Sequence, residues 1–402
     1  MSSSMFSAVE LAPRDPILGL TEAYNADPRP NKVNLGVGVY YDDNGRLPLL
    51  AAVREAEQAR LAAAPAHGYL PIEGFAAYNQ AVQQLLFGKD SPLLAEGRVA
   101  TFEALGGTGG LKIGADFLKR LNPDAQVWIS DPSWENHRAL FEAAGFVVNN
   151  YPYYDPVTHG VKTDEMLGTL ESLPTGSIVV LHVCCHNPTG VDLPLEQWRR
   201  IVDIARSRRL VPFLDMAYQG FGDGIEADAA PLRLFADSGL SFFVSSSFSK
   251  SFSLYGERVG ALTVVTANRD ETARVTSQVK RVIRTNYSNP PTYYAAVVAD
   301  VLSTPALRQK WEEELAGMRE RIRQMRTQLV AKLAERGVAQ DFSFVSKQRG
   351  MFSYSGLNPK QVERLREEFG IYAVGTGRIC LAALNSRNID TVADAIAKVV
   401  SG

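Results

Sequence analysis

Short apolar runs alternate with segments of helical periodicity along the chain from about residue 100 onward. Several of these runs are apolar at successive positions, which is typical of strands covered on both faces. The predicted helices between them include 111–121, 134–144 and 195–208. The strand candidates are 101–105, 126–130, 145–151, 177–185, 211–215, 241–245 and 260–266. This alternation predicts an α/β fold with a mostly parallel, doubly wound seven-stranded sheet.

The two ends of the chain have a different pattern. A long helix is predicted from about 305 to 336, where apolar residues recur at steps of three and four. That periodicity fits a helix lying along a globular body and, less well, a coiled-coil seam. Shorter elements follow at 350–354, 359–369, 371–374, 378–382 and 389–399, and a strand at 34–40 and a helix at 49–63 lie near the N-terminus. We therefore expect an N-terminal arm at 1–14, a discontinuous α+β small domain of 15–47 plus 318–402, and a large domain of 48–317.

Composition narrows the class of protein. The 402 residues include 42 basic and 44 acidic side chains, with a net charge of −2, which argues against general electrostatic binding of nucleic acid. The sequence contains neither a membrane-spanning apolar stretch nor the apolar core of a secretory signal. Three cysteines cannot form a disulfide framework, so we expect a reducing, cytoplasmic location.

Candidate chemistry follows the predicted strands, because ligands of open α/β sheets bind beyond the carboxyl ends of the strands. The run Gly-Gly-Thr-Gly-Gly at 106–110 opens a helix and could cradle a phosphate, although a tight turn is the simpler explanation of the glycines alone. Trp134 could be a flat apolar plate for a ring or a core residue. Asn187 precedes a proline and is either a turn residue or an amide donor.

Two further strand ends carry ionisable groups. Asp215 ends an apolar strand, where an acid needs a partner, and Tyr218 follows it. Lys250 ends another strand among hydroxyls, with Arg258 nearby, and burial there would lower the pKa of the amine and make it nucleophilic. A lysine, an acid, an amide, an aromatic plate and a phosphate cradle together meet the needs of pyridoxal phosphate.

A metal site is not expected. His182, Cys184, Cys185 and His186 are close in sequence, but successive side chains of the predicted strand 177–185 point to opposite faces. These four side chains therefore should not converge on one ion.

The motifs at the strand ends resemble fold-type I pyridoxal-phosphate aminotransferases, and most closely the bacterial aspartate and aromatic amino acid group. The matching motifs are Ser-Phe-Ser-Lys at 247–250, Leu-Tyr-Gly-Glu-Arg-Val-Gly at 254–260, Cys-His-Asn-Pro-Thr-Gly at 185–190 and Asn-Tyr-Ser-Asn-Pro-Pro at 286–291. The resemblance extends from about residue 15 to the C-terminus.

The resemblance implies a role for each matching residue. Lys250 would hold the cofactor as a Schiff base and then move the proton at the substrate Cα. Asp215, supported by His137, would pair with the pyridinium nitrogen. Tyr218 and Asn187 would hydrogen-bond the phenolic oxygen. Trp134 would lie against the ring, and the phosphate would be held by Gly107, Thr108, Ser247, Ser249 and Arg258.

The resemblance also implies how amino acids and 2-oxo acids bind. Arg378 would grip the α-carboxylate in a two-pronged way that lysine cannot copy, and Gly38 would border the substrate. The site would be shared across a homodimer interface, where Tyr69 reaches the neighbouring subunit's phosphate. Arg284 would meet the distal carboxylate of a dicarboxylic substrate, although an exposed arginine is by itself usually only solvated.

The predicted activity is that of an aromatic amino acid aminotransferase. It would transfer the amino group of phenylalanine or tyrosine, and also of aspartate, to 2-oxoglutarate by a ping-pong mechanism. An aspartate aminotransferase with little aromatic activity is the alternative, and a lyase or decarboxylase is a weaker one. A ligand-sensing regulator is also weaker, because it would need a DNA-binding module and residues 1–48 lack a helix-turn-helix pattern. Gly110 and the stretch 292–294 depart from the family pattern.

Overall fold

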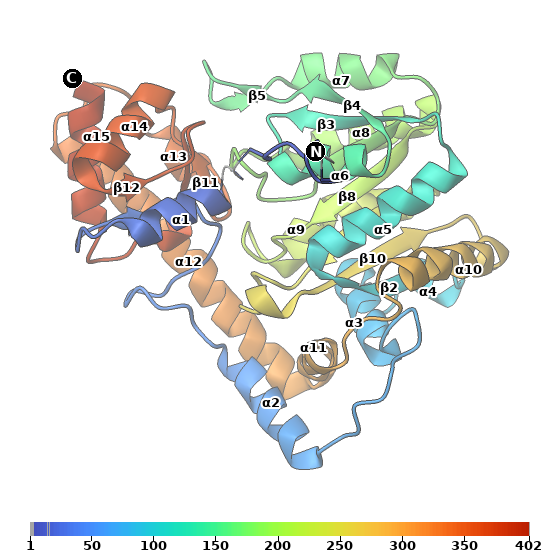
Figure 1. Cartoon of the computed structure of the whole chain (residues 1–402). Coiled ribbons are helices and arrows are strands. Elements are labelled where there is room, and N and C mark those ends of the chain that lie inside the picture. The colour runs from blue at the N-terminus through green and yellow to red at the C-terminus, as the bar shows by residue number, and fades with distance from the viewer. Residues whose placement is uncertain (1–3, 14, 16, 402) are drawn as a thin grey trace.

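A seven-stranded sheet forms the centre of the larger part of the molecule (Figure 1), in a computed structural model that describes residues 4–13, 15 and 17–401. Its strands, in spatial order, are β2 (Val99–Leu105), β10 (Val259–Val265), β9 (Phe242–Ser247), β8 (Val211–Met216), β7 (Ile178–His182), β3 (Gln126–Asp131) and β4 (Val147–Pro152). Strand β10 pairs antiparallel with β2 and β9, and the remaining pairs of this sheet are parallel. The predicted mostly parallel α/β fold is therefore confirmed.

Helices cover both faces of this sheet, and alternate residues of each central strand enter different cores. On β7, Ile178 and Val180 belong to one apolar cluster, whereas Val179 and Leu181 belong to the other. The helices on the first face are α5 (Gly106–Leu121), α6 (Glu135–Ala143) and α10 (Arg269–Asn286). Those contributing to the second cluster include α3 (Ala76–Phe87), α7 (Thr163–Ser172), α8 (Leu195–Arg208), α9 (Ile225–Asp237) and α11 (Tyr293–Ser303). Burial on both faces explains why these strands are apolar at successive positions.

The long helix α12 (Pro305–Glu335) connects the sheet region to a smaller group of elements and runs diagonally in Figure 1. It begins with Pro305 in its first turn, where a missing N–H costs nothing. Its apolar side chains, from Trp311 to Leu333, are buried in the main core. The helix packs against α2 (Ala51–Ala63), α11 and α15 (Ile389–Ser401). The prediction of a helix lying along a globular body is therefore confirmed.

Segments from both ends of the chain lie together at the left of Figure 1. The parallel pair of β1 (Val33–Asn34) and β12 (Ile371–Tyr372) joins them, and Arg29 donates a 2.8 Å hydrogen bond to the carbonyl of Arg366. The other elements here are α1 (Leu18–Ala26), α13 (Phe344–Lys347), α14 (Pro359–Phe369) and the antiparallel pair of β11 (Phe352–Tyr354) and β13 (Arg378–Cys380). The N-terminal segment thus packs with the C-terminal elements.

Several predicted strands are longer than those observed, including those expected at 350–354 and 371–374, which are reduced to β11 and β12. The strand expected at 177–185 ends at His182, because the carboxylate of Asp192 accepts hydrogen bonds from the amides of Cys185 and His186 and turns the chain. The strand expected at 34–40 is only β1, and the one at 378–382 gives way to a 3₁₀ turn at Leu381–Ala383. Small elements complete the fold: α4 (Pro92–Ala95) and the hairpin of β5 (Tyr154–Asp155) and β6 (Gly160–Val161).

Residues 1–3 and Arg14 of the expected arm, Pro16 and the terminal Gly402 lie outside the described residues. Within the described part of the chain, no helix is both long and apolar enough to cross a membrane.

Candidate active site

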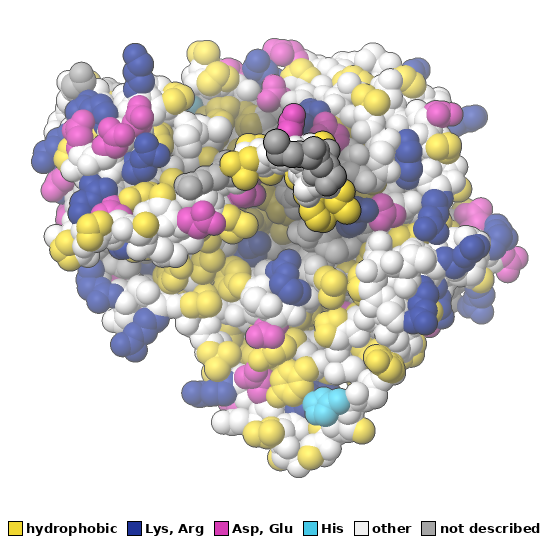
Figure 2. Space-filling model, in the orientation of Figure 1, with side chains coloured by type: hydrophobic (Ala, Val, Ile, Leu, Met, Phe, Trp, Pro, Cys, Tyr) yellow, Lys and Arg dark blue, Asp and Glu magenta, His cyan; other side chains and the backbone are white. Residues whose placement is uncertain are grey.

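A cavity of about 220 Å³ lies beyond the carboxyl ends of β7, β8 and β9. Figure 2 shows a hollow on one face of the molecule, and a surface on which Lys and Arg side chains are mixed with Asp and Glu. The predicted site residues that line the cavity are Gly38, Gly107, Thr108, Trp134, Asn187, Asp215, Tyr218, Ser247, Ser249, Lys250, Arg258 and Arg378. The structure therefore brings together residues from distant segments, as strand ends meeting at one sheet edge require.

Lys250 follows β9 and points into the cavity, with its Nζ atom 5.2 Å from the ring centre of Tyr218. Removal from bulk water, opposed by Asp215 and assisted by Arg258 and Arg378, lowers the pKa of this amine to about 8. At neutral pH an appreciable fraction of Lys250 is consequently the neutral, nucleophilic amine.

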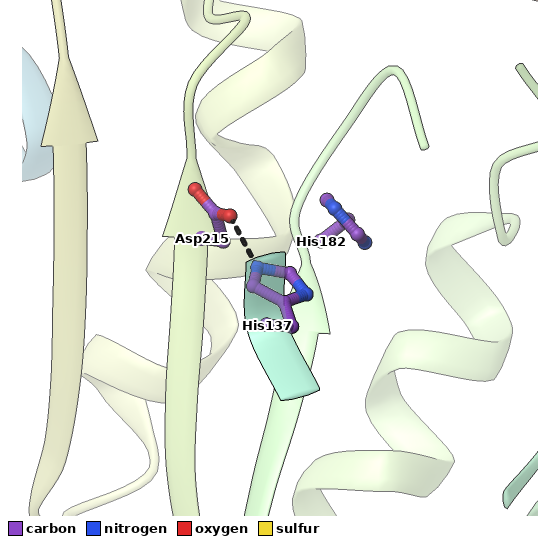
Figure 3. Close-up of side chains that lie close together, drawn as sticks. All are labelled: His137, His182 and Asp215. Atoms are coloured by element: carbon purple, nitrogen blue, oxygen red, sulfur yellow. Dashed lines mark hydrogen bonds and ion pairs between the residues drawn. The ribbon is translucent and has the colours of Figure 1, made fainter. Parts of the chain in front are cut away.

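Asp215, at the end of β8, is held by a buried histidine (Figure 3). Its Oδ2 atom lies 2.8 Å from Nε2 of His137, whose Nδ1 lies 2.9 Å from Oγ of Ser133. Burial acts to raise the pKa of Asp215, but the hydrogen bond and charge of His137 outweigh it and hold that pKa below its ordinary value. The result is a buried carboxylate that stays ionised.

His182 lies beside this pair, with its ring centre 4.8 Å from that of His137 (Figure 3). Burial lowers the pKa of His182 to about 3, and repulsion from His137 adds to the effect. The ring is therefore neutral, and it lines the cavity without adding a second charge beside Asp215.

The glycine-rich turn joins β2 to α5 and forms one wall of the cavity. Gly106 has φ +69°, and a Cβ atom there would lie 2.5 Å from Nη2 of Arg258. At Gly107 a Cβ atom would lie 3.1 Å from Cβ of Ser247. The guanidinium of Arg258 is fixed by a 2.8 Å hydrogen bond to the carbonyl of Tyr255. Backbone amides at a helix N-terminus beside hydroxyls and an arginine make this wall suitable for a phosphate.

Arg378, on β13, is buried at 1% exposure and is oriented by neutral groups. Its Nη1 donates to Oδ1 of Asn187 at 3.1 Å and its Nη2 to the carbonyl of Gly36 at 2.6 Å. The guanidinium carbon lies 4.3 Å from the ring centre of Phe352. No carboxylate pairs with Arg378 among the described residues, and its buried Nε has no hydrogen-bond partner there. A buried cation of this kind needs an anionic ligand.

Three predicted site residues lie outside the cavity lining. His137 lies behind Asp215, as described above. Tyr69 is 95% exposed, and Arg284 is exposed on α10, where it hydrogen-bonds Ser288. A single chain therefore does not bring Tyr69 or Arg284 to the other site residues.

The structure adds lining residues that sequence reasoning missed, namely Ile17, Leu111, Ala217 and Phe352. Ala217 lies between two predicted residues, and Leu111 directly follows the glycine-rich run at 106–110, so both had a positional signal. Ile17 and Phe352 come from the two ends of the chain, and only the packing of those ends brings them here.

The two departures from the family pattern have different surroundings. A Cβ atom at Gly110 would lie 2.7 Å from the carbonyl oxygen of Ala261 and 2.9 Å from Oγ of Ser245, so glycine allows α5 to lie close to β10 and β9. Tyr293 and Tyr294 begin α11 and pack edge to face, with ring centres 5.0 Å apart. Neither tyrosine lines the cavity.

The prediction that Cys184 and Cys185 lie on one strand, with their side chains on opposite faces, is wrong because the strand ends at His182. The two sulfur atoms and a carboxylate oxygen of Asp228 lie within 4.8 Å of one another. The Asp228 carboxylate already accepts hydrogen bonds from the amides of Gly220, Gly222 and Asp223. In this arrangement its oxygens fix the loop that follows Tyr218.

Comparison with known proteins agrees with this arrangement. Residues 30–396 match the family model described as aminotransferase class I and II. The chain is 68% identical over 397 residues to an aspartate aminotransferase of Pseudomonas aeruginosa, covering 99% of this chain and 100% of the relative. It is 52% identical over 399 residues to the aromatic-amino-acid aminotransferase of Escherichia coli, covering 98% and 100%. A crystal structure of an aromatic-amino-acid aminotransferase from Burkholderia pseudomallei, covalently bound to pyridoxal phosphate, superposes with a TM-score of 0.97 at 67% identity, covering 99% and 100%.

Proposed function

This chain belongs to the class I and II aminotransferase family, and we propose that it transfers amino groups from phenylalanine, tyrosine and aspartate to 2-oxoglutarate. Its cofactor is pyridoxal 5′-phosphate. The observation that carries the proposal is one cavity in which a lysine of lowered pKa, an ionised buried acid and an unpaired buried arginine meet.

The residues present fit this cofactor. The turn at 106–108 with Ser247, Ser249 and Arg258 suits its phosphate, and the Asp215 carboxylate suits its pyridine nitrogen. When bound, the cofactor supplies an electron sink conjugated to the substrate amino group. The protein's part is to place that group, to hold charge and to move protons.

Lys250 is the attachment point for the cofactor in this proposal. Once the substrate has displaced Lys250 from the cofactor, Nζ would be available as a neutral base. It would then carry the proton between the substrate Cα and atom C4′ of the cofactor. Asp215 stays anionic, held by His137, and keeps the pyridine nitrogen protonated.

Asn187 and Tyr218 act as donors to the phenolic oxygen. Because Oδ1 of Asn187 accepts from Arg378, the amide NH₂ of Asn187 is the group left to donate. Burial raises the pKa of Tyr218, so its hydroxyl keeps its proton and can donate as well. Trp134 closes the apolar side of the ring site.

Arg378 binds the substrate α-carboxylate in the proposal. Asn187, Gly36 and Phe352 fix its plane, so little side-chain entropy is lost when the carboxylate binds. Gly38, which lines the same cavity, leaves room for the Phe352 ring that packs on Arg378, because a Cβ atom there would lie 2.6 Å from Cζ of Phe352.

The complete site is proposed to need a homodimer. Tyr69 and Arg284 are exposed and remote from their own cavity, so each is free to enter a neighbouring subunit's site. There Tyr69 would contact the phosphate, and Arg284 would meet the distal carboxylate of aspartate or 2-oxoglutarate.

We also propose the division into an arm at 1–14, a small domain of 15–47 plus 318–402, and a large domain of 48–317. The proposed location is the cytoplasm, where the free thiols of Cys184, Cys185 and Cys380 stay reduced.

Half-reactions test the substrate assignment. The purified holoenzyme is titrated with phenylalanine, tyrosine and aspartate separately, and the loss of the cofactor's absorbance band is followed. Reaction with all three supports the proposal. Reaction with aspartate alone favours the second candidate, an aspartate aminotransferase, which is the name of the 68% identical relative.

Arg284→Leu tests the dicarboxylate contact, with Arg281→Leu, an exposed arginine of the same helix, as the matched control. The first variant should lose about 100-fold in kcat/KM for aspartate and far less for phenylalanine, because only aspartate leaves a carboxylate unpaired. Equal losses for both substrates would remove Arg284 from the distal-carboxylate role.

A further inference from the structure

A buried acid outside the cavity lies under the segment that carries Tyr69. Glu103, in the middle of β2, is 1% exposed. Its backbone N–H donates to the carbonyl of Glu73 at 3.0 Å, and its Oε2 accepts from the amide of Phe75 at 3.1 Å. Gly74 has φ +95°, and a Cβ atom there would lie 2.7 Å from Oε2 of Glu103. The carboxyl group therefore packs tightly against the segment 73–75, with no room for a side chain at Gly74.

No cation balances this carboxyl group within the described residues. The ionisable groups around it are Tyr78 on α3, Tyr287 after α10, and the 2.8 Å ion pair of Glu73 with Lys280. The Tyr78 hydroxyl donates to the carbonyl of Gly260, and the Tyr287 hydroxyl to the main-chain carbonyl of Glu103. Burial raises the pKa of Glu103 to about 8. At neutral pH the group is mostly protonated.

Glu103 stands between two parts of the proposed site. Along β2 the chain reaches the phosphate wall at Gly106 within three residues. Glu103 also contacts the segment 73–75, which follows Tyr69 by four residues, and the side chain of Tyr69 is 95% exposed. That segment is held from its other side by Asn289, which donates to the carbonyl of Leu70 at 2.9 Å.

We propose that Glu103 is a positioning residue that fixes the segment 70–75 and thereby places Tyr69 against the cofactor phosphate of the neighbouring subunit. The inference rests on the shared-site homodimer proposed above. Glu103 acts in its neutral form, because an ionised carboxylate at this buried point would draw in water and displace the segment. Cofactor retention in one subunit would then depend on an acid in the other.

The pH dependence of cofactor dissociation tests the proposal in the holoenzyme. In the wild type, the dissociation rate of the cofactor should rise about tenfold between pH 7 and pH 9. This is the change expected if ionisation of Glu103 costs the phosphate its one hydrogen bond from Tyr69, because a hydrogen bond to a charged group contributes about this much. Glu103→Gln keeps a neutral side chain of the same shape at every pH and should flatten this profile. Glu96→Gln, at an exposed acid just before the same strand, is the matched control and should keep the wild-type profile. A Glu103→Gln profile that rises like the wild type would overturn the proposal.

Mixed dimers distinguish a contact across the interface from a local effect on the subunit's own phosphate wall. One chain carries Lys250→Ala, so that only its partner holds the cofactor covalently. Glu103→Gln placed in the Lys250→Ala chain should flatten the profile, whereas the same change in the cofactor-holding chain should leave it unaltered. The reverse pattern would refute positioning of Tyr69. A wild-type protein that binds no pyridoxal phosphate would instead refute the proposed function itself.

Discussion

Lys250 should weaken the folded protein in the absence of its cofactor, because its charge is held away from water. Lys250→Met removes that charge and keeps a flexible chain of similar length. In the cofactor-free protein this variant should therefore be more stable than the wild type at neutral pH, although it is inactive. The stabilisation would be a direct measure of the free energy that the site devotes to a reactive amine.

The size of the effect follows from the pKa of about 8 in the folded state against 10.5 for an ordinary lysine. The difference of about 2.5 between these two pKa values corresponds to a cost of about 3 kcal/mol in the free energy of folding. The attraction of Asp215 is already included in this cost. The depressed pKa means that the cost is fully present below pH 8 and disappears as the pH rises through 10.5, where the unfolded chain also loses its proton. The gain from Lys250→Met should thus fall from about 3 kcal/mol at pH 6.5 to about 1 kcal/mol at pH 9.5.

Urea unfolding of the two cofactor-free proteins measures this difference, at equal subunit concentration because the concentration would set the apparent stability of the proposed dimer. Lys360→Met, at an exposed lysine of α14, is the control and should change stability by less than about 0.5 kcal/mol at any pH. A gain that is the same at pH 6.5 and pH 9.5 would show that packing, not charge, is responsible. No gain at all would show that Lys250 is well solvated.

Three further variants test other parts of the site. Arg378→Lys should lower kcat/KM about 100-fold for aspartate and phenylalanine alike, because an ammonium group cannot make the two-pronged contact; retained activity in steady-state assays would contradict this. Gly38→Ala should raise the KM for amino acids about tenfold without loss of cofactor absorbance, because its Cβ atom displaces Phe352 from Arg378; an unchanged KM would refute that coupling. His137→Leu should raise the pKa of Asp215, since only the weaker influences of His182 and Lys250 then oppose burial, so the holoenzyme should lose cofactor at a higher pH on acidification; a pH profile like the wild type's would exclude this support.

The sheet could be predicted from the sequence because its strands are covered on both faces. Each predicted strand of the seven overlaps an observed one, and the helices at 195–208 and 359–369 have the predicted bounds. One error occurs where side-chain hydrogen bonds, not apolar patterning, end a strand. Asp192 turns the chain after His182 although residues 183–185 are as apolar as the strand before them.

The cavity residues were predictable for a related reason. Asp215 lies at the end of a buried strand, Asn187 and Lys250 follow two others, and parallel strand ends meet at one edge. The roles assigned to them came from the family resemblance, not from position alone. Residues such as Ile17 and Phe352 had no comparable signal, because the small group of elements brings them to the cavity through long-range packing.

The near-neutral charge of the chain was a poor guide to its ligands because the relevant field is local. Lys250, Arg258 and Arg378 line one cavity whose acid, Asp215, is already hydrogen-bonded to His137. The mutual influence of these cations is visible in the lowered pKa of Lys250, to which both arginines contribute. The excess positive charge therefore does two things at once. It prepares the site for a phosphate and a carboxylate, and it keeps the lysine partly deprotonated until those anions arrive. Binding of the anions should then offset the two arginines and raise the pKa of Lys250, which favours its acting as a base that holds the substrate proton.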